Sequence, residues 1–374
     1  MMKRITTALL VAAAMLCVLP IYISAYDAES SPIGEVSEYL PDELTDSLPD
    51  PLKGVTTPEA VIGALDFRST AKWLCEIALE CLRGVLSPFC RILAVVVIGT
   101  VFGALKSGIS SDALSQAVGY AVSLCTALTV YDAIGALWEQ SAVQFERLTV
   151  LMNSMLPVMT TLYAAGGNVT SAAVSNASLT AVMALLENIL ASGLYPILQL
   201  CFVLSVMGCI SGCIDLGGVA DFVRNTYTTV LVFVMMLLST TMAYQNKLAS
   251  AADSTAARTI KFAAGNLIPV VGGAVGEAVR MIGGSLELIK STVGILGVIA
   301  IAAVVLPLVI SLIINKSALN FISVISRTLG CDAESRIIAS AAGMINLTLA
   351  LVASASVIFV YALALFIKTA AAIS

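Results

Sequence analysis

The chain has 374 residues, of which 59% are hydrophobic and only 11% are charged. Soluble domains carry roughly a quarter charged residues, so this composition excludes a water-soluble globular protein and indicates an integral membrane protein. There is no histidine, which removes imidazole bases, histidine-supported triads and the usual zinc sites. The net charge of −5 comes with no basic patch, so we expect no nucleic-acid partner.

The beginning of the chain has the layout of an export signal. A basic start and an apolar core precede the small residues Ser24 and Ala25, which suit a cleavage point. Because Ile23 is larger than cleavage favours, residues 1–25 are predicted to be either a signal peptide or an uncleaved anchor. Residues 26–66 have a strong acidic excess and several prolines, which predicts an acidic extracytoplasmic arm.

Residues 67–86 are predicted to form an amphipathic interfacial helix. Charged residues recur every three or four positions from Arg68 to Arg83, while apolar residues such as Trp73 and Ile77 occupy another face. A helix of this kind lies along the membrane surface, leads into the first span or docks on a partner.

Residues 87–374 are predicted to form a polytopic, all-α membrane domain. The apolar runs are near the twenty residues that a bilayer-spanning helix requires, and they lack the alternation of a transmembrane barrel. We expect about seven spans and two broken or re-entrant segments, at 148–166 and 263–284. The spans are expected at about 88–105, 113–137, 171–191, 194–214, 226–245, 292–314 and 345–367.

Prolines suggest a possible internal repeat within this domain. Pro157 and Pro269 lie 112 residues apart, and the next pair, Pro196 and Pro307, lie 111 apart. Repeated landmarks with nearly equal spacing are typical of duplicated halves, and broken segments in matching positions often mark a translocation or binding site. The repeats are expected at about 145–257 and 258–370.

The candidate site residues either disrupt a helix or are polar groups among apolar neighbours. Non-helical backbone persists at membrane depth only inside protein or beside water. An ionisable side chain there, such as Glu187, is costly unless it faces a partner or cavity. The candidates for lining a pathway or packing the core are Pro157, Glu187, Asn266, Pro269, Gly272, Gly273, Gly276, Glu277 and Arg280.

Each of these residues also has a structural interpretation, as a satisfied internal contact or an interfacial position. The glycines of "GGAVGEAV" lack the order of a dinucleotide-binding loop, and no Walker lysine pattern follows. We therefore predict no catalytic residue, no metal site and no cofactor.

The chain resembles stage III sporulation protein AE of endospore-forming Firmicutes. The resemblance rests on the signal-like leader, the acidic arm and the stretches "TIKFAAGNLIPVVGG" and "LIKSTVGILGVIAI", and it is most specific from about Thr259 to Val298. It implies a membrane subunit of the channel or secretion-like complex that joins mother cell and forespore and is required for late forespore development. The implied location is the mother-cell membrane surrounding the forespore.

The resemblance also implies partners. They are other stage III sporulation A-operon proteins, including an ATPase and ring-forming subunits, and indirectly stage II sporulation protein Q, together with membrane lipid. No catalytic motif is implied, so we expect no enzyme. Two other functions stay open. A stand-alone secondary transporter or permease fits the repeat and the broken segments, and a non-conducting scaffold fits the lack of convincing charged pathway residues.

Overall fold

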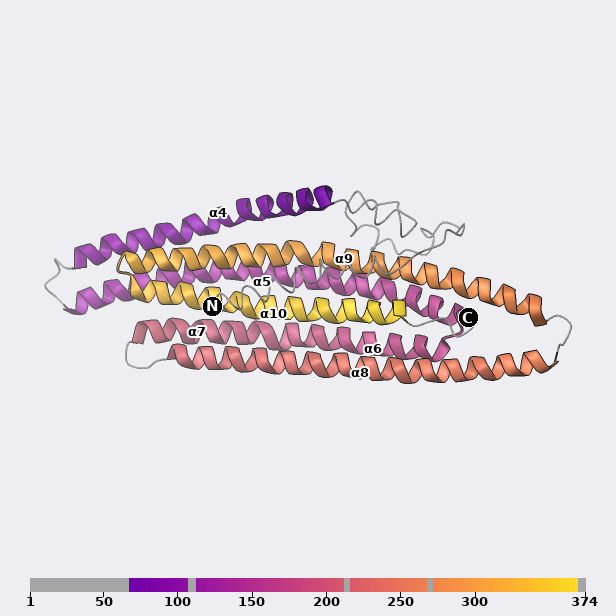
Figure 1. The fold of residues 1–374 in the computed structure, drawn as a ribbon. Helices are drawn as coiled ribbons and strands as arrows, with labels where there is room; N and C mark the ends of the chain where they lie inside the picture. The colour runs from indigo at the N-terminus through magenta and orange to yellow at the C-terminus, as the bar shows by residue number, and fades with distance from the viewer. Residues whose placement is uncertain (1–66, 107–111, 212–215, 268–271, 369–374) are drawn as a thin grey trace.

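The computed structural model describes residues 67–106, 112–211, 216–267 and 272–368, which form an all-α bundle of long helices (Figure 1). The helices are α4 (Phe67–Lys106), α5 (Asp112–Ala165), α6 (Val169–Asn188), the π-helix η3 (Ile189–Leu194), α7 (Tyr195–Ser211), α8 (Leu216–Leu267), α9 (Gly272–Thr328) and α10 (Asp332–Lys368). Six of these described helices are long and apolar enough to cross a membrane, which confirms the predicted fold class. The expected signal or anchor and the acidic arm lie outside the described residues.

The chain runs up and down the length of the bundle (Figure 1). Because α6, η3 and α7 follow one another without a turn, they make a single pass. We call the proximal end the one that carries the α4–α5, α7–α8 and α9–α10 connections, at the left of Figure 1. The distal end carries the α5–α6 and α8–α9 connections.

Two of the connections are tight glycine turns. Gly167 follows α5 with φ 78°, and Gly330 follows α9 with φ 81°. In the first turn the Asn168 amide donates to the Tyr163 carbonyl at 2.9 Å, and in the second the Cys331 amide donates to the Ser326 carbonyl at 3.0 Å. This pattern of carbonyl capping needs a left-handed residue, which glycine adopts without a steric penalty.

The interior is one continuous apolar cluster supplied mainly by α5, α9 and α10. Gly297 shows how closely these helices approach one another. A Cβ atom placed there would lie 2.9 Å from the Met155 Cε of α5 and 2.9 Å from the Leu363 Cδ1 of α10. Val293, Leu296 and Ala300 on α9 are fully buried beside it, so α9 is packed on several sides. The centre of the described bundle is therefore filled by side chains.

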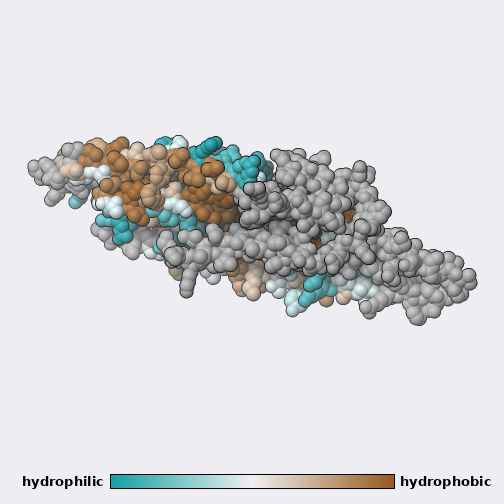
Figure 2. Space-filling model, turned by 45° about the horizontal axis from the view of Figure 1, so that its top comes forward, coloured by the Kyte–Doolittle hydropathy of each residue, from teal (hydrophilic) through white to brown (hydrophobic). Residues whose placement is uncertain are grey.

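Large apolar side chains that remain exposed gather toward the proximal end. Figure 2 shows a broad hydrophobic area over the left part of one face, bordered by hydrophilic residues toward the middle. Leu128 of α5 is 69% exposed and Met236 of α8 is 68% exposed. Soluble monomers rarely expose apolar areas of this extent, so the area indicates contact with lipid or protein.

The first segment expected to be broken, 148–166, is instead mostly regular helix. It lies within α5, which has 54 residues and contains Pro157. Pro157 is on the exposed side of α5, where the carbonyl that loses its partner need not be buried. The charged residues between 137 and 148 do not end the helix either. The expected span 113–137 and the expected broken segment 148–166 therefore lie in one helix.

The spans expected at 171–191 and 194–214 are likewise not separated by a turn. Pro196 lies in this stretch, and a proline cannot donate to the carbonyl four residues earlier. The π-helix η3 directly precedes Tyr195 and Pro196 and takes up the mismatch, so helical structure continues from 169 to 211. The described helices therefore make six passes along the bundle, where about seven spans were expected.

In the second segment expected to be broken, 263–284, the described residues are regular helix on both sides of residues 268–271. α8 ends at Leu267 and α9 begins at Gly272. Pro269 lies outside the described residues. The amphipathic segment 67–86 is also not separate, because it is the first half of α4 and Pro88 lies inside that helix. The possible repeat stays a prediction.

Candidate functional site

A buried carboxylate joins α8 to the first turn of α6. Asp253 is 4% exposed. Its two oxygens accept the Thr170 amide at 2.9 Å, the Ser171 amide at 2.8 Å and the Ser171 hydroxyl at 2.7 Å. The first amides of a helix have no partner within it and carry partial positive charge, so an anion there is favourable. Asp253 thus caps a helix to which it does not belong.

The same two helices are joined further along by a ladder of polar side chains. The Ser175 hydroxyl donates to the Asn246 side-chain oxygen at 3.0 Å, and the Asn246 amide donates to the Met242 carbonyl at 3.0 Å. At the exposed edge of the same two helices, the Ser178 hydroxyl donates to the Gln245 side-chain oxygen at 2.5 Å. We call these contacts, together with Asp253, the α6–α8 seam. Buried polar groups of this kind are stabilising when satisfied and costly when one partner is removed.

A groove runs along the outside of the α6–α8 seam. It has a volume of about 500 Å³. Small side chains such as Ala177 and Ala181 line it from α6, and Thr241 and Gln245 line it from α8. Larger apolar side chains, among them Leu238, Met242 and Leu248, complete the lining from α8.

A buried lysine occupies the junction of α5, α9 and α10. Lys290 is 1% exposed, and its Nζ lies 4.9 Å from the ring centre of Tyr163 and 5.5 Å from that of Phe366. The two rings meet edge to face with centroids 5.1 Å apart. A cation over aromatic faces is attracted by their electron density, most strongly where water is excluded. We call these three residues the cation–aromatic centre.

Two further polar contacts lie nearer the proximal end. Arg91 of α4 forms an ion pair with Asp132 of α5 at 3.2 Å, and both side chains are more than half exposed. Ser123 of α5 donates to the buried carboxylate of Glu334 in α10 at 2.8 Å. These contacts tie α5 to helices on either side of it.

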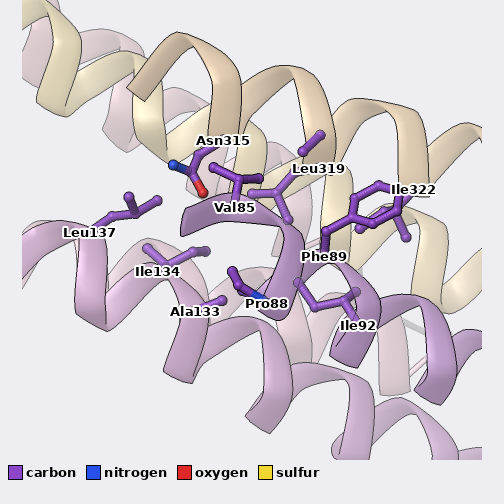
Figure 3. Close-up of a pocket in the computed structure, with 11 residues that line it drawn as sticks. Val85, Pro88, Phe89, Ile92, Ala133, Ile134, Leu137, Asn315, Leu319 and Ile322 are labelled. Carbon is purple, nitrogen blue, oxygen red and sulfur yellow. The ribbon is translucent and has the colours of Figure 1, made fainter. Parts of the chain in front are cut away.

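A narrow apolar crevice lies where α4 crosses α5 and α9 (Figure 3). Pro88 and Phe89 line it from α4, Ile134 lines it from α5, and Leu319 and Asn315 line it from α9. Its volume of about 10 Å³ is close to that of one water-sized probe. The crevice is thus a packing seam around the proline rather than room for a ligand.

The structure separates the residues that the sequence singled out. Pro157 in α5 and Glu187 near the end of α6 are both exposed. Asn266 is the penultimate residue of α8. Gly272, Gly273, Gly276, Glu277 and Arg280 lie in the first turns of α9, at the distal end of the bundle (Figure 1). Their shared role as a pathway or core site stays a prediction.

Sequence reasoning missed Asp253 and Lys290, which the structure places in buried contacts. Asp253 sits in "SAADSTAA", which reads as a polar connection when each residue is taken alone. A usable signal was the spacing, because Ser171, Ser175 and Ser178 share one helical face, as do Asn246 and Asp253. Two polar faces of matching length predict that the helices carrying them pair.

The described groups bind helices to one another rather than present reactive atoms. Among residues whose placement is described, no three Cys, Asp or Glu side chains gather as metal ligands do. The fold and its polar contacts define a polytopic helical membrane protein held together by buried hydrogen bonds and a buried cation.

Comparison with known proteins narrows this class to one family. Residues 59–370 match the family described as stage III sporulation protein AE, so the chain belongs to that family. It is 24% identical over 282 residues to stage III sporulation protein AE of Bacillus subtilis (strain 168), covering 74% of this chain and 69% of that protein. No solved structure matches it. A role in sporulation and a membrane location follow from the family and the apolar helices.

Proposed function

We propose that this chain is a membrane subunit of the channel or secretion-like complex that connects mother cell and forespore. In this role it lies in the mother-cell membrane around the forespore and is required for late forespore development. The observation that carries the proposal is the family match over residues 59–370, which takes in every described helix. The six span-capable helices support a membrane subunit.

The proposal includes partners, because the chain is expected to act in an assembly. The partners proposed are other stage III sporulation A-operon proteins, among them an ATPase and ring-forming subunits, and indirectly stage II sporulation protein Q. The groove along the α6–α8 seam supports this, since an open, mostly apolar groove suits the apolar face of a helix from a partner. We propose no enzymatic activity for the chain.

A non-conducting scaffold is the second candidate function, and the packed interior favours it. Gly297 lies against Met155 and Leu363 without space for a Cβ atom, and the α9 side chains beside it are buried. In a scaffold, a transport route lies between this subunit and its partners rather than within the chain. The stand-alone transporter has less support, because the expected break at Pro157 is regular helix.

The proposal is tested in the endospore-forming host by deleting the gene and restoring it with a tagged copy. We expect deletion strains to complete engulfment and then to lose late forespore gene expression. The tagged protein, purified from sporulating membranes after mild cross-linking, is expected to bring down an ATPase and ring-forming subunits. Normal spores without the gene would refute the sporulation role.

Reconstitution distinguishes a channel subunit or a scaffold, which both need partners, from a stand-alone transporter. Purified protein in liposomes is expected to support no energy-dependent solute uptake without its partners. Uptake by the protein alone, abolished by unfolding it, would establish a transporter instead. Failure to recover any partner from cross-linked membranes would count against both the channel subunit and the scaffold.

A further inference from the structure

The helices are much longer than a bilayer is thick. α5 has 54 residues and α8 has 52, which correspond to about 80 Å each at ~1.5 Å per residue. The hydrocarbon core of a bilayer is only about 30 Å thick. A tilt large enough to bury such helices fully would exceed the usual range. Part of the bundle must therefore stand outside the membrane.

The exposed apolar side chains show which part lies in lipid. They are densest on α5 between Leu114 and Tyr131, with five such residues, and on α8 between Val219 and Leu237, with seven, whereas only two more follow on each helix. Each stretch covers about 26–27 Å of helix axis, close to the hydrocarbon thickness. Both stretches begin near the proximal end. We call this zone the belt, and it includes Val97, Ile98, Leu124, Leu128, Phe233 and Met236.

Charged side chains border the belt on both sides. On the distal side they lie on four different helices, about 30–47 Å from the proximal end along their axes. They are Arg83, Asp132, Glu139, Glu187 and Lys247, all exposed. Toward the proximal end, the exposed residues Asp221, Arg327, Asp332 and Arg336 stand within about 8 Å of it.

The charged residues between these borders are paired or partly covered. Arg91 reaches toward the distal border and pairs with Asp132 at 3.2 Å, as a long cationic side chain near a membrane surface does. Glu334 is buried and accepts a hydrogen bond from Ser123. Lys316 is partly buried. The belt is thus compatible with hydrocarbon.

Beyond the distal border the exposed surface changes character. α6 presents small residues such as Ala177 and Thr180, and α5 presents Glu146 and Arg147. A few large apolar residues remain exposed, for example Leu248, but they are scattered as on ordinary aqueous surfaces. The α6–α8 seam and the cation–aromatic centre both lie in this half.

We propose that the bilayer covers only the belt, and that the distal half of the bundle projects into water as a helical stalk. This inference concerns how the chain sits in the membrane and stands without the proposed function. Glu187 then belongs to the membrane–water border rather than to an intramembrane pathway. The α6–α8 groove is open to the aqueous compartment, where a water-soluble partner can reach it.

Single cysteines test the proposal in matched pairs on the same helix. Leu128→Cys and Val150→Cys compare belt and stalk on α5, and Phe233→Cys and Leu248→Cys compare them on α8. All four native side chains are large, apolar and at least 46% exposed. The full chain is used in sheared membranes, with a charged, membrane-impermeant maleimide reaching both faces, and labelling is measured as the increment over the parent protein.

We expect Val150→Cys and Leu248→Cys to react at least about tenfold faster than their partners, because the reactive thiolate forms in water and not in hydrocarbon. A second measurement uses the unmodified chain, labelled by a photoreactive probe carried on lipid tails and mapped by mass spectrometry. That label is expected on 114–131 and 219–237. Equal maleimide protection of both members of each pair, or equal lipid labelling of 138–165 and 240–256, would overturn the proposal.

Discussion

Asp253 and Ser171 lie 82 residues apart in the chain, yet the carboxylate of one holds both the amide and the hydroxyl of the other at 2.8 and 2.7 Å. The contact holds the first turn of α6 against α8. It replaces the usual arrangement, in which the capping side chain directly precedes its own helix. The position of α6 is therefore tied to that of α8.

Replacing Asp253 by alanine is expected to lower the free energy of unfolding by about 1–3 kcal/mol, because the Thr170 and Ser171 amides lose a charged acceptor. Asp253→Asn keeps one acceptor oxygen and should cost less. SDS unfolding in mixed micelles measures both. Asp221→Ala is the control, since this aspartate of α8 is exposed and pairs with Arg224 one turn away. Equal losses for Asp221 and Asp253 would contradict the capping role.

The cation–aromatic centre predicts energetic coupling between Lys290 and Phe366. Lys290→Met and Phe366→Leu, made singly and together, are expected to show a coupling of roughly 0.5–2 kcal/mol in unfolding free energy. The control cycle pairs Lys290→Met with Phe321→Leu, which changes an exposed aromatic residue further along α9. That cycle should be additive. Additivity in both cycles would show that the ring contributes no attraction to the cation.

Glycines in α9 and α4 should respond differently to enlargement. A Cβ atom at Gly294 would collide with the side chain of Ile367, whereas at Gly103 no heavy atom lies within 4 Å. Gly294→Leu is expected to cost about 1–3 kcal/mol or more by overpacking. Gly103→Leu should be close to neutral. Membrane abundance and SDS resistance report both, and equal tolerance would mean that α9 and α10 separate easily.

Glu187 provides a test of the pathway interpretation in the cell. Its exposed position near the end of α6 predicts that Glu187→Gln leaves spore yield and membrane abundance unchanged, because the side chain can already reach water. Spore counts after heat treatment measure the effect. Arrest after engulfment, with normal membrane abundance, would instead show that the Glu187 carboxylate is needed for function, as the pathway interpretation requires.

Particular residues show why part of this architecture could be predicted from sequence and part could not. Apolar runs of about twenty residues reliably indicate helices, and they did so here. The expected helix boundaries depended on Pro157 and Pro196, because prolines commonly interrupt helices. One of these is tolerated on an exposed side of α5, and the other follows a π-helix. Neither of these two arrangements can be recognised from the amino-acid composition around the proline.

The polar contacts could not be predicted residue by residue, because each depends on which helices become neighbours. Asp253 and Lys290 look like solvated residues until the packing of α8 and α9 is known. Glu187 was noticeable for the opposite reason, since its neighbours in sequence are apolar although its side chain is exposed. Burial is a property of the assembled bundle and is only weakly encoded in nearby residues.

The separation between Asp253 and Ser171 also has a consequence for biosynthesis. At ribosomal rates of about 5–20 residues per second, the 82 residues between them take roughly 4–16 seconds to synthesise. During that interval the first turn of α6 exists without the carboxylate that completes it. The amides of Thr170 and Ser171 must meanwhile be satisfied by water or by a protein that holds the nascent chain, and α6 reaches its final position only after α8 has followed it out of the ribosome.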